Sequence, residues 1–136
     1  SIDEKILNEY HKQGFIKYLG YQKDIRKIWE GAHVAVLPSY REGLSRSLLE
    51  AAAYGRAIIT TDAPGGRELI NNKINGLLVP IKDSQSLADA MENLVSDIKL
   101  RESLATAIRS DVLKNYDSEL ISKKIVSFYL LDDTVK

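Results

Sequence analysis

The chain has 136 residues, which is the length of one domain with a sizeable core. Its 19 basic and 19 acidic side chains cancel, so the charge balance argues against nucleic acid or an anionic membrane surface as a partner. The absence of cysteine excludes disulfides, thiolate metal sites and cysteine nucleophiles, and it permits a reducing cytoplasmic setting. No apolar run approaches the ~20 residues that a membrane-spanning helix needs.

The first part of the chain predicts two helices, with a short strand between them. Residues 3–13 and 24–31 have helical patterns, and the second places Ile25, Ile28 and Trp29 at helical spacing. Residues 15–19 form a short apolar, β-favouring run that ends at a glycine. This segment is therefore the first predicted strand.

The middle of the chain alternates strands with helices. Residues 33–38 and 56–61 are short apolar runs suited to buried parallel strands, and residues 45–55 predict a helix closed by glycine. After a brief helix at residues 67–71, an Asn-Gly turn leads into a strand at residues 77–79. Strands that alternate with helices indicate a parallel sheet with helices on its faces.

From Ser84 onward the pattern is helical. Its apolar side chains fall into three stripes, which we interpret as packing faces and not as a cofactor site. The stripes are Leu87, Ala90, Met91 and Leu94, then Leu100, Leu104, Ala107 and Ile108, and then Leu120, Ile121, Ile125, Val126 and Tyr129. We therefore expect a three-layer α/β/α fold with about four parallel strands and a helical C-terminal segment.

Two carboxylates lie on either side of a predicted helix start. Ser45 is a suitable N-cap, the amides of the first turn suit a phosphate, and Gly43 lets a ligand approach the backbone. Glu50 lies five residues into the helix, about 7–8 Å along its axis at ~1.5 Å per residue, which is about the length of one sugar ring. Glu42 and Glu50 could then accept hydrogen bonds from the two sugars of a nucleotide sugar.

A simpler interpretation of the two glutamates needs no ligand. Glu42 would favour the helix dipole from outside the N-terminus, and Glu50 would be a solvated helix position. The spacing alone favours this second interpretation.

The segment PSYREGLSRSLLEAAAYGRAIITTDAPGGREL, followed by NGLLVP, resembles the nucleotide-binding domain of the family-four retaining glycosyltransferases. These enzymes have the B-type fold of two Rossmann-like domains. In that family a Pro-Ser strand end, a Glu-Gly pair, a second glutamate eight residues after the first and an alanine-rich helix ending in glycine occur together. The resemblance extends over residues 15–94 and is greatest to bacterial enzymes that build capsular, exopolysaccharide and lipid-linked oligosaccharide chains.

The resemblance implies a set of donor-binding residues. Glu42 would contact the transferred sugar and is the expected catalytic residue, and Glu50 would bind the ribose hydroxyls. The other expected donor-binding positions, at the helix start and in a loop that contacts the base, are Gly43, Leu44, Ser45, Gly20 and Tyr21.

The implied reaction transfers a sugar from a nucleoside diphosphate to an acceptor hydroxyl with retention at the anomeric carbon. Helix amides and basic side chains would stabilise the charge on the leaving diphosphate. The sequence has no Asp-x-Asp motif, so we expect neither a metal nor a cofactor. The expected donor substrate is a UDP-sugar.

The sequence also departs from the family. The family's phosphate-binding arginine and lysine, and the N-terminal domain that binds the acceptor glycan or glycolipid, have no counterpart here. We therefore expect residues 1–136 to be a partial C-terminal domain that is inactive alone and whose first two strands are separated by two absent strands. The intact enzyme is expected in the cytoplasm, peripheral to the inner membrane.

A second hypothesis comes from a different class of protein. The chain would be a noncatalytic α/β nucleotide-binding or interaction module that a partner chain completes. A parallel sheet without its central strands has unpaired edges, and such edges favour dimerisation.

Overall fold

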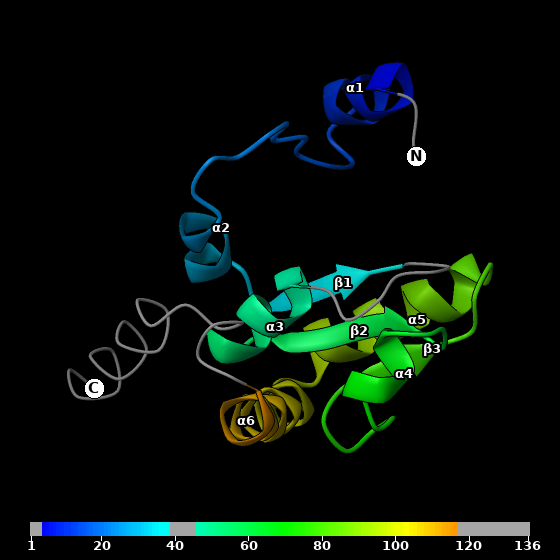
Figure 1. Ribbon diagram of the computed structural model, residues 1–136. Coiled ribbons are helices and arrows are strands. Elements are labelled where there is room, and N and C mark those ends of the chain that lie inside the picture. Colours follow the sequence, from blue (N-terminus) through cyan, green and yellow to red (C-terminus); the bar gives the residue numbers. More distant parts are fainter. Residues whose placement is uncertain (1–3, 39–45, 117–136) are drawn as a thin grey trace.

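The computed structural model describes residues 4–38 and 46–116 of the chain (Figure 1). Helices and strands alternate along most of this length, and two longer helices follow. In chain order the elements are α1 (Glu4–Lys12), α2 (Arg26–Gly31), β1 (Val34–Leu37), α3 (Arg46–Ala53), β2 (Ala57–Thr61), α4 (Gly66–Leu69), β3 (Leu77–Val79), α5 (Ser84–Ser96) and α6 (Ile98–Asn115).

The three strands form one parallel sheet in the order β1-β2-β3. Strand β2 lies in the middle, and all five of its residues are buried. Because the strands are parallel, their carboxyl ends meet at one edge of the sheet and their amino ends at the opposite edge. We call these the carboxyl edge and the amino edge.

The core has two parts, one on each face of the sheet. Ile58 of β2 packs in a cluster with the apolar face of α3, whereas Ile59, the next residue, packs in a second cluster with Leu94 of α5. This alternation follows from the two-residue period of a strand. A fully buried side chain of this size contributes about 1.5–3 kcal/mol to stability. The two helices therefore cover opposite faces of the sheet.

The 18-residue helix α6 joins the two parts of the core. Its Leu104 belongs to the cluster with α5, and Ile108 and Val112 belong to the cluster with α3. These findings confirm the three-layer α/β/α fold and the helical segment that follows the sheet. The third predicted stripe, at residues 120–129, lies outside the described residues.

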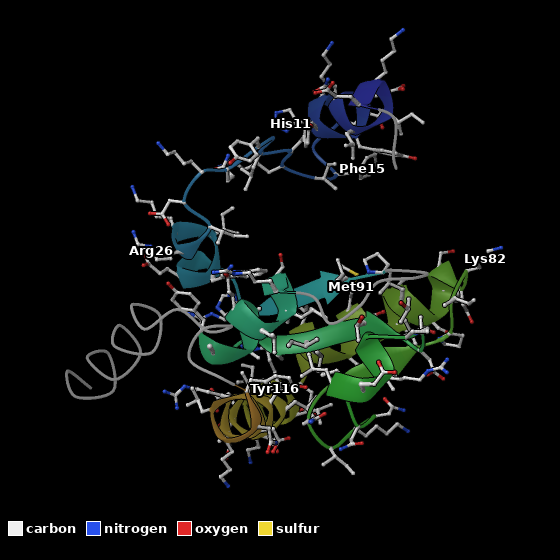
Figure 2. The ribbon with its side chains drawn as sticks, in the orientation of Figure 1. His11, Phe15, Arg26, Lys82, Met91 and Tyr116 are labelled. Carbon is white, nitrogen blue, oxygen red and sulfur yellow. The ribbon has the colours of Figure 1, made fainter. Side chains whose placement is uncertain are left out.

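The prediction of a strand at residues 15–19 is wrong, and the described sheet has three strands instead of about four. A strand needs a partner for its backbone N–H and C=O groups, and the described residues offer this segment no neighbouring strand. Its side chains are accordingly uncovered, with Phe15 74% exposed. Figure 2 shows Phe15 beside α1, on a part of the chain that lies apart from the sheet.

The other predicted elements of the described residues are confirmed within a few residues. Helix α3 ends as its glycine predicts, because Gly55 has φ +77° and donates its N–H to the carbonyl of Ala52, while Arg56 donates to that of Ala51. The predicted Asn-Gly turn leads directly into β3. Among the helices of residues 4–38 and 46–116, none has the length and apolar character needed to cross a bilayer.

Candidate functional site

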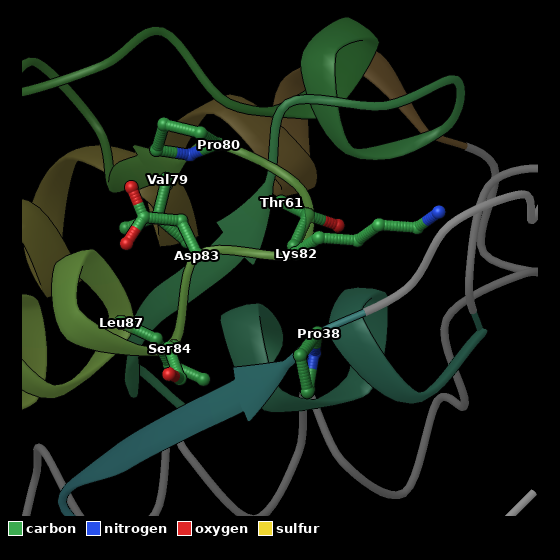
Figure 3. Close-up of a pocket in the computed structure, with 8 residues that line it drawn as sticks. All are labelled: Pro38, Thr61, Val79, Pro80, Lys82, Asp83, Ser84 and Leu87. Atoms are coloured by element: carbon green, nitrogen blue, oxygen red, sulfur yellow. The ribbon is translucent and has the colours of Figure 1, made fainter.

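A pocket of about 380 Å³ opens at the carboxyl edge of the sheet. Figure 3 shows that its lining comes from the ends of all three strands and from the start of α5. The residues that line it are Pro38, Thr61, Val79, Pro80, Lys82, Asp83, Ser84 and Leu87. We call it the carboxyl-edge pocket.

The parallel sheet explains why these residues meet. Pro38 directly follows β1, Thr61 ends β2, and Pro80 directly follows β3, so sequence positions about twenty residues apart come to one edge. In open α/β sheets, ligands bind outside the carboxyl ends of the strands. The carboxyl-edge pocket therefore has the position of a ligand site.

The turn between β3 and α5 supplies the charged groups of this pocket. Lys82 adopts a left-handed backbone conformation with φ +55°, and Asp83 is the N-cap of α5. Asp83 Oδ1 accepts the backbone N–H of Ser86 at 2.9 Å, and Oδ2 accepts its hydroxyl at 2.7 Å. These bonds, the backbone one first, hold the pKa of Asp83 below its ordinary value. Figure 3 shows the Lys82 and Asp83 side chains extending in different directions.

Close packing shapes the neighbouring connection between β2 and α4. A Cβ atom on Gly66 would lie only 2.7 Å from the carbonyl oxygen of Thr61, so only glycine lets α4 begin this close to the strand end. Asp62, the next residue after β2, pairs with Arg67 at 3.1 Å. This ion pair is exposed. At this strand end Thr61, and not Asp62, lines the carboxyl-edge pocket.

Helix α3 carries the predicted ribose-binding carboxylate. The side chain of Glu50 is only 14% exposed, and its Oε1 accepts Arg46 Nε at 3.1 Å, one helical turn earlier. A carboxylate so well covered differs from the solvated side chain of the simpler interpretation. Because α3 is the next described element after β1, its N-terminus lies toward the carboxyl edge. The contact of Glu50 with ribose stays a prediction.

Of the remaining predicted site residues, the structure describes Gly20 and Tyr21, and it does not bring these two together with Glu50. Gly20 has φ +64° and open space around it, and Tyr21 is 92% exposed, both on the connection between α1 and α2. In Figure 1 this connection runs apart from α3 and the sheet. The other predicted positions fall outside the described residues, and they are Glu42, Gly43, Leu44 and Ser45.

Sequence reasoning missed the contribution of Lys82 and Asp83. Their signal was present, since Pro80 ends an apolar run and Asp83 is a good N-cap before a helical pattern. The rule that ligands bind beyond the carboxyl ends of parallel strands points to the loop after β3 as well. Within the described part of the chain, no three His, Cys, Asp or Glu side chains gather as ligands of a metal ion.

Comparison with known proteins identifies relatives of the chain. It is 36% identical, over 89% of its length, to an N,N'-diacetylbacillosaminyl-diphospho-undecaprenol alpha-1,3-N-acetylgalactosaminyltransferase of Campylobacter jejuni, of which it covers 32%. It is 29% identical, over 82% of its length, to a UDP-Gal:alpha-D-GlcNAc-diphosphoundecaprenol alpha-1,3-galactosyltransferase of Escherichia coli, of which it covers 29%.

A solved structure has the same fold. It is the C-terminal domain of a group 1 family glycosyl transferase (LpcC) from Francisella tularensis, which is 31% identical with a TM-score of 0.71. The match covers 84% of this chain and 62% of that one. The chain spans about a third of the length of the curated relatives it matches.

The family itself is identified by a match over most of the chain. Residues 2–97 match the family described as Glycosyl transferases group 1. This range contains the whole sheet, the carboxyl-edge pocket and Glu50. The chain therefore belongs to the group 1 glycosyltransferases.

Proposed function

We propose that this chain is the part of a retaining glycosyltransferase that holds a nucleoside-diphosphate sugar. The observation that carries the proposal is the position of the carboxyl-edge pocket, at the strand ends where open parallel sheets bind ligands. Membership of the group 1 glycosyltransferases supports it. Residues 1–136 would form a partial C-terminal donor-binding domain.

Glu50 is the proposed ribose ligand. A bidentate contact with two vicinal hydroxyls needs both carboxylate oxygens, and a carboxylate has about four acceptor positions. Among the described residues, Arg46 donates to Oε1 and uses one of these positions, and we propose that the ribose takes others. The ion pair would also hold the side chain in one orientation before the donor binds, which reduces the entropy cost of binding.

The proposed roles of the remaining residues follow from the family motif. Glu42 would contact the transferred sugar, and the backbone amides at residues 43–45 would bind the sugar and the diphosphate at the N-terminus of α3. Gly20 and Tyr21 would contact the base. Tyr21 is exposed enough to do so after the α1–α2 connection moves toward α3.

We propose uridine as the base of the donor. The name of the Escherichia coli relative specifies UDP-Gal, which supports this choice. Titration calorimetry of the chain with UDP, GDP and CDP tests it, and the expected result is heat of binding for UDP above that for the other two. Equal binding of all three nucleotides would contradict the choice of base.

The acceptor is proposed to be a glycan or glycolipid, bound by a separate N-terminal domain of the whole protein. Both named relatives act on diphospho-undecaprenol substrates according to their names, and the chain spans about a third of their length. An enzyme with such an acceptor would work at the cytoplasmic side of the inner membrane as a peripheral protein.

The second hypothesis, a noncatalytic module completed by a partner, also has a structural observation in its favour. Among the described strands, β1 pairs with β2 alone, so its other edge has backbone N–H and C=O groups without a strand partner. A second copy could supply that partner. Light scattering during size-exclusion chromatography would show a dimer if this proposal holds and a monomer if it does not.

The two glutamates provide the test in the intact enzyme. Glu50→Ala should chiefly raise KM, because a ribose contact is nearly the same in the ground and transition states. Glu42→Ala should lower kcat by ~10²-fold, because its contact is to the sugar that changes charge as the bond breaks. Glu92→Ala, at an exposed position of α5, is the control and should change neither. If all three variants have wild-type kinetics, the donor-binding proposal is wrong.

A further inference from the structure

A second pocket, of about 320 Å³, lies at the amino edge of the sheet. We call it the amino-edge pocket. His33 precedes β1 and Arg56 precedes β2, and the first residues of the two strands pair in register, so these two residues enter the sheet side by side. The full lining is His33, Gly55, Arg56, Arg101, Glu102, Ala105 and Thr106. This pocket is separate from the carboxyl-edge pocket, because the two lie at opposite ends of the same strands.

The end of helix α3 holds Arg56 in place. The N–H groups of Gly55 and Arg56 donate to carbonyls of the last turn of α3, at 2.9 and 3.0 Å. The side chain is fixed as well, because Arg56 Nε donates to the carbonyl of Trp29 at 2.7 Å in a partly buried position. Arg56 thus connects α2, α3 and β2 and keeps its guanidinium at the pocket wall.

Arg101 of α6 is held in a similar way by the last turns of α5. Its Nη1 donates to the carbonyl of Leu94 at 3.2 Å, again in a partly buried position. A guanidinium has five N–H donors, and each of these two arginines uses one on a backbone carbonyl. A carbonyl fixes the orientation of a guanidinium without cancelling its charge, so most donors and the full charge remain for a ligand.

The charges around the amino-edge pocket do not balance. Neither Arg56 nor Arg101 takes part in an ion pair within the described residues. Glu102 supplies one carboxylate to the lining, so two guanidinium groups face one negative charge. The C-terminus of α3 carries a partial negative charge that disfavours an anion, but the amides of residues 55 and 56 already donate to its last carbonyls. The excess is positive.

We propose that the amino-edge pocket binds a phosphate-bearing ligand. Two fixed guanidinium groups suit a phosphate because their planar forks can each donate two parallel hydrogen bonds to its oxygens. Thr106 adds a hydroxyl to the lining, and the volume lies within the range of small-molecule sites. The phosphate of a soluble phosphorylated compound and that of a phospholipid head group share this chemistry.

Titration of the ¹⁵N-labelled chain with inorganic phosphate, at constant ionic strength, tests the proposal by nuclear magnetic resonance. We expect saturable shifts of the amides of Arg56, Arg101 and Thr106, with a Kd in the millimolar range. Arg101→Gln should weaken binding about tenfold, the usual effect of losing a charge-assisted hydrogen bond. Lys99→Gln is the matched control, because it removes one positive charge from the same helix outside the pocket lining, and it should leave the Kd unchanged.

Two further variants keep the test decisive if Arg101→Gln does not fold. Arg56→Lys keeps the charge but loses the planar fork, and it should also weaken phosphate binding. Glu102→Gln removes the opposing carboxylate and should strengthen binding several-fold. A Kd that these two variants leave unchanged would overturn the proposal.

Vesicles distinguish the two sources of phosphate. If the protein sediments with phosphatidylcholine vesicles that contain phosphatidylglycerol, and Arg101→Gln does not, the ligand is a lipid head group. Saturable binding of inorganic phosphate without sedimentation would identify a soluble phosphorylated compound. Shifts that do not saturate, or equal effects of Arg101→Gln and Lys99→Gln, would show non-specific charge attraction and overturn the proposal. A UDP titration of the same variants reports on the donor site independently.

Discussion

The N-terminal arm, residues 4–33, and the sheet region, residues 34–38 and 46–116, contrast in how they use apolar side chains. The sheet region has a buried core of large aliphatic residues, in which Ile58, Ile59 and Ile108 have no exposed surface, although others, such as Ile74 and Val95, are exposed. The arm leaves comparable residues uncovered. Its exposed large side chains are Ile6, Tyr10, Phe15, Ile16, Leu19 and Tyr21. Composition therefore does not decide burial in this chain, because burial requires partner elements on both sides.

The arm also shows which structure a segment forms by contacts among its own residues. Helix α1 forms although none of its residues is buried, since its hydrogen bonds join residues four apart in the same segment. Tyr10 and Phe15 make an edge-to-face ring contact with centroids 6.3 Å apart, again within the arm. The arm thus keeps the structure that its own residues can supply and lacks what a neighbouring strand would supply.

The largest expected difference between the two regions comes from truncating an apolar side chain in each. Ile58→Ala should lower the free energy of unfolding by about 2–5 kcal/mol, because it removes buried methyl groups and leaves a cavity. Phe15→Ala should change it by less than about 0.5 kcal/mol. Urea unfolding measures both. If Ile58→Ala does not fold, Ile58→Val, at about 0.5–1.5 kcal/mol, replaces it. A large effect of Phe15→Ala would show that the arm packs against another part of the chain.

A pair of glycines sharpens the comparison at the level of the backbone. Gly66→Ala should cost about 1–3 kcal/mol, because the new Cβ would overlap the carbonyl oxygen of Thr61 at the end of β2. Gly31→Ala, at the end of α2 in the arm, has no atom within 4 Å of the new Cβ and should be neutral or slightly stabilising. Thermal unfolding followed by circular dichroism gives both values. Equal costs would contradict the close approach at Gly66.

A helix cap tests how much of the stability of α6 is local. The carboxylate of Asp97 accepts the N–H of Leu100 at 3.0 Å, so Asp97→Ala should cost about 1 kcal/mol. Asp97→Asn keeps an acceptor of similar quality and should cost much less. Urea unfolding of the two variants checks this, and a loss as large for asparagine as for alanine would mean that the charge, and not the cap, stabilises the helix.

The smallest effect is expected in the arm. Arg26 donates to the carboxylate of Asp24 from its side chain and its backbone, and these bonds lower the pKa of Asp24 to about 2. The interaction is present above the ordinary pKa of aspartate and is lost as the pH falls through about 2. Carbon-detected titration of the chain should show this midpoint, and Arg26→Gln should return it toward the ordinary value without a change in the unfolding of the sheet. A midpoint that stays low in Arg26→Gln would contradict the assignment.

Much of the fold could be predicted because its signals are local. The glycine that ends α3 and the turn before β3 each act within a few residues, and the structure has these features where the pattern indicates them. The two-residue alternation of β2 is local too. The motif around Glu50 also identified the family, although the contacts of its carboxylates with a donor stay predictions.

Tertiary structure alone decided the remaining features, because they depend on residues far apart in the sequence. Residues 15–19 have the composition of a strand, yet they form none because no strand of residues 4–38 and 46–116 pairs with them. Asn75 is a residue type that is common in turns. It is nevertheless buried, and its side-chain amide donates to the carboxylate of Asp111, 36 positions away, at 2.8 Å. Both pockets likewise join residues from separate elements. Local sequence specifies helices, turns and candidate strands, whereas hydrogen-bonding partners and packing surfaces from distant segments decide which strands form and which side chains meet.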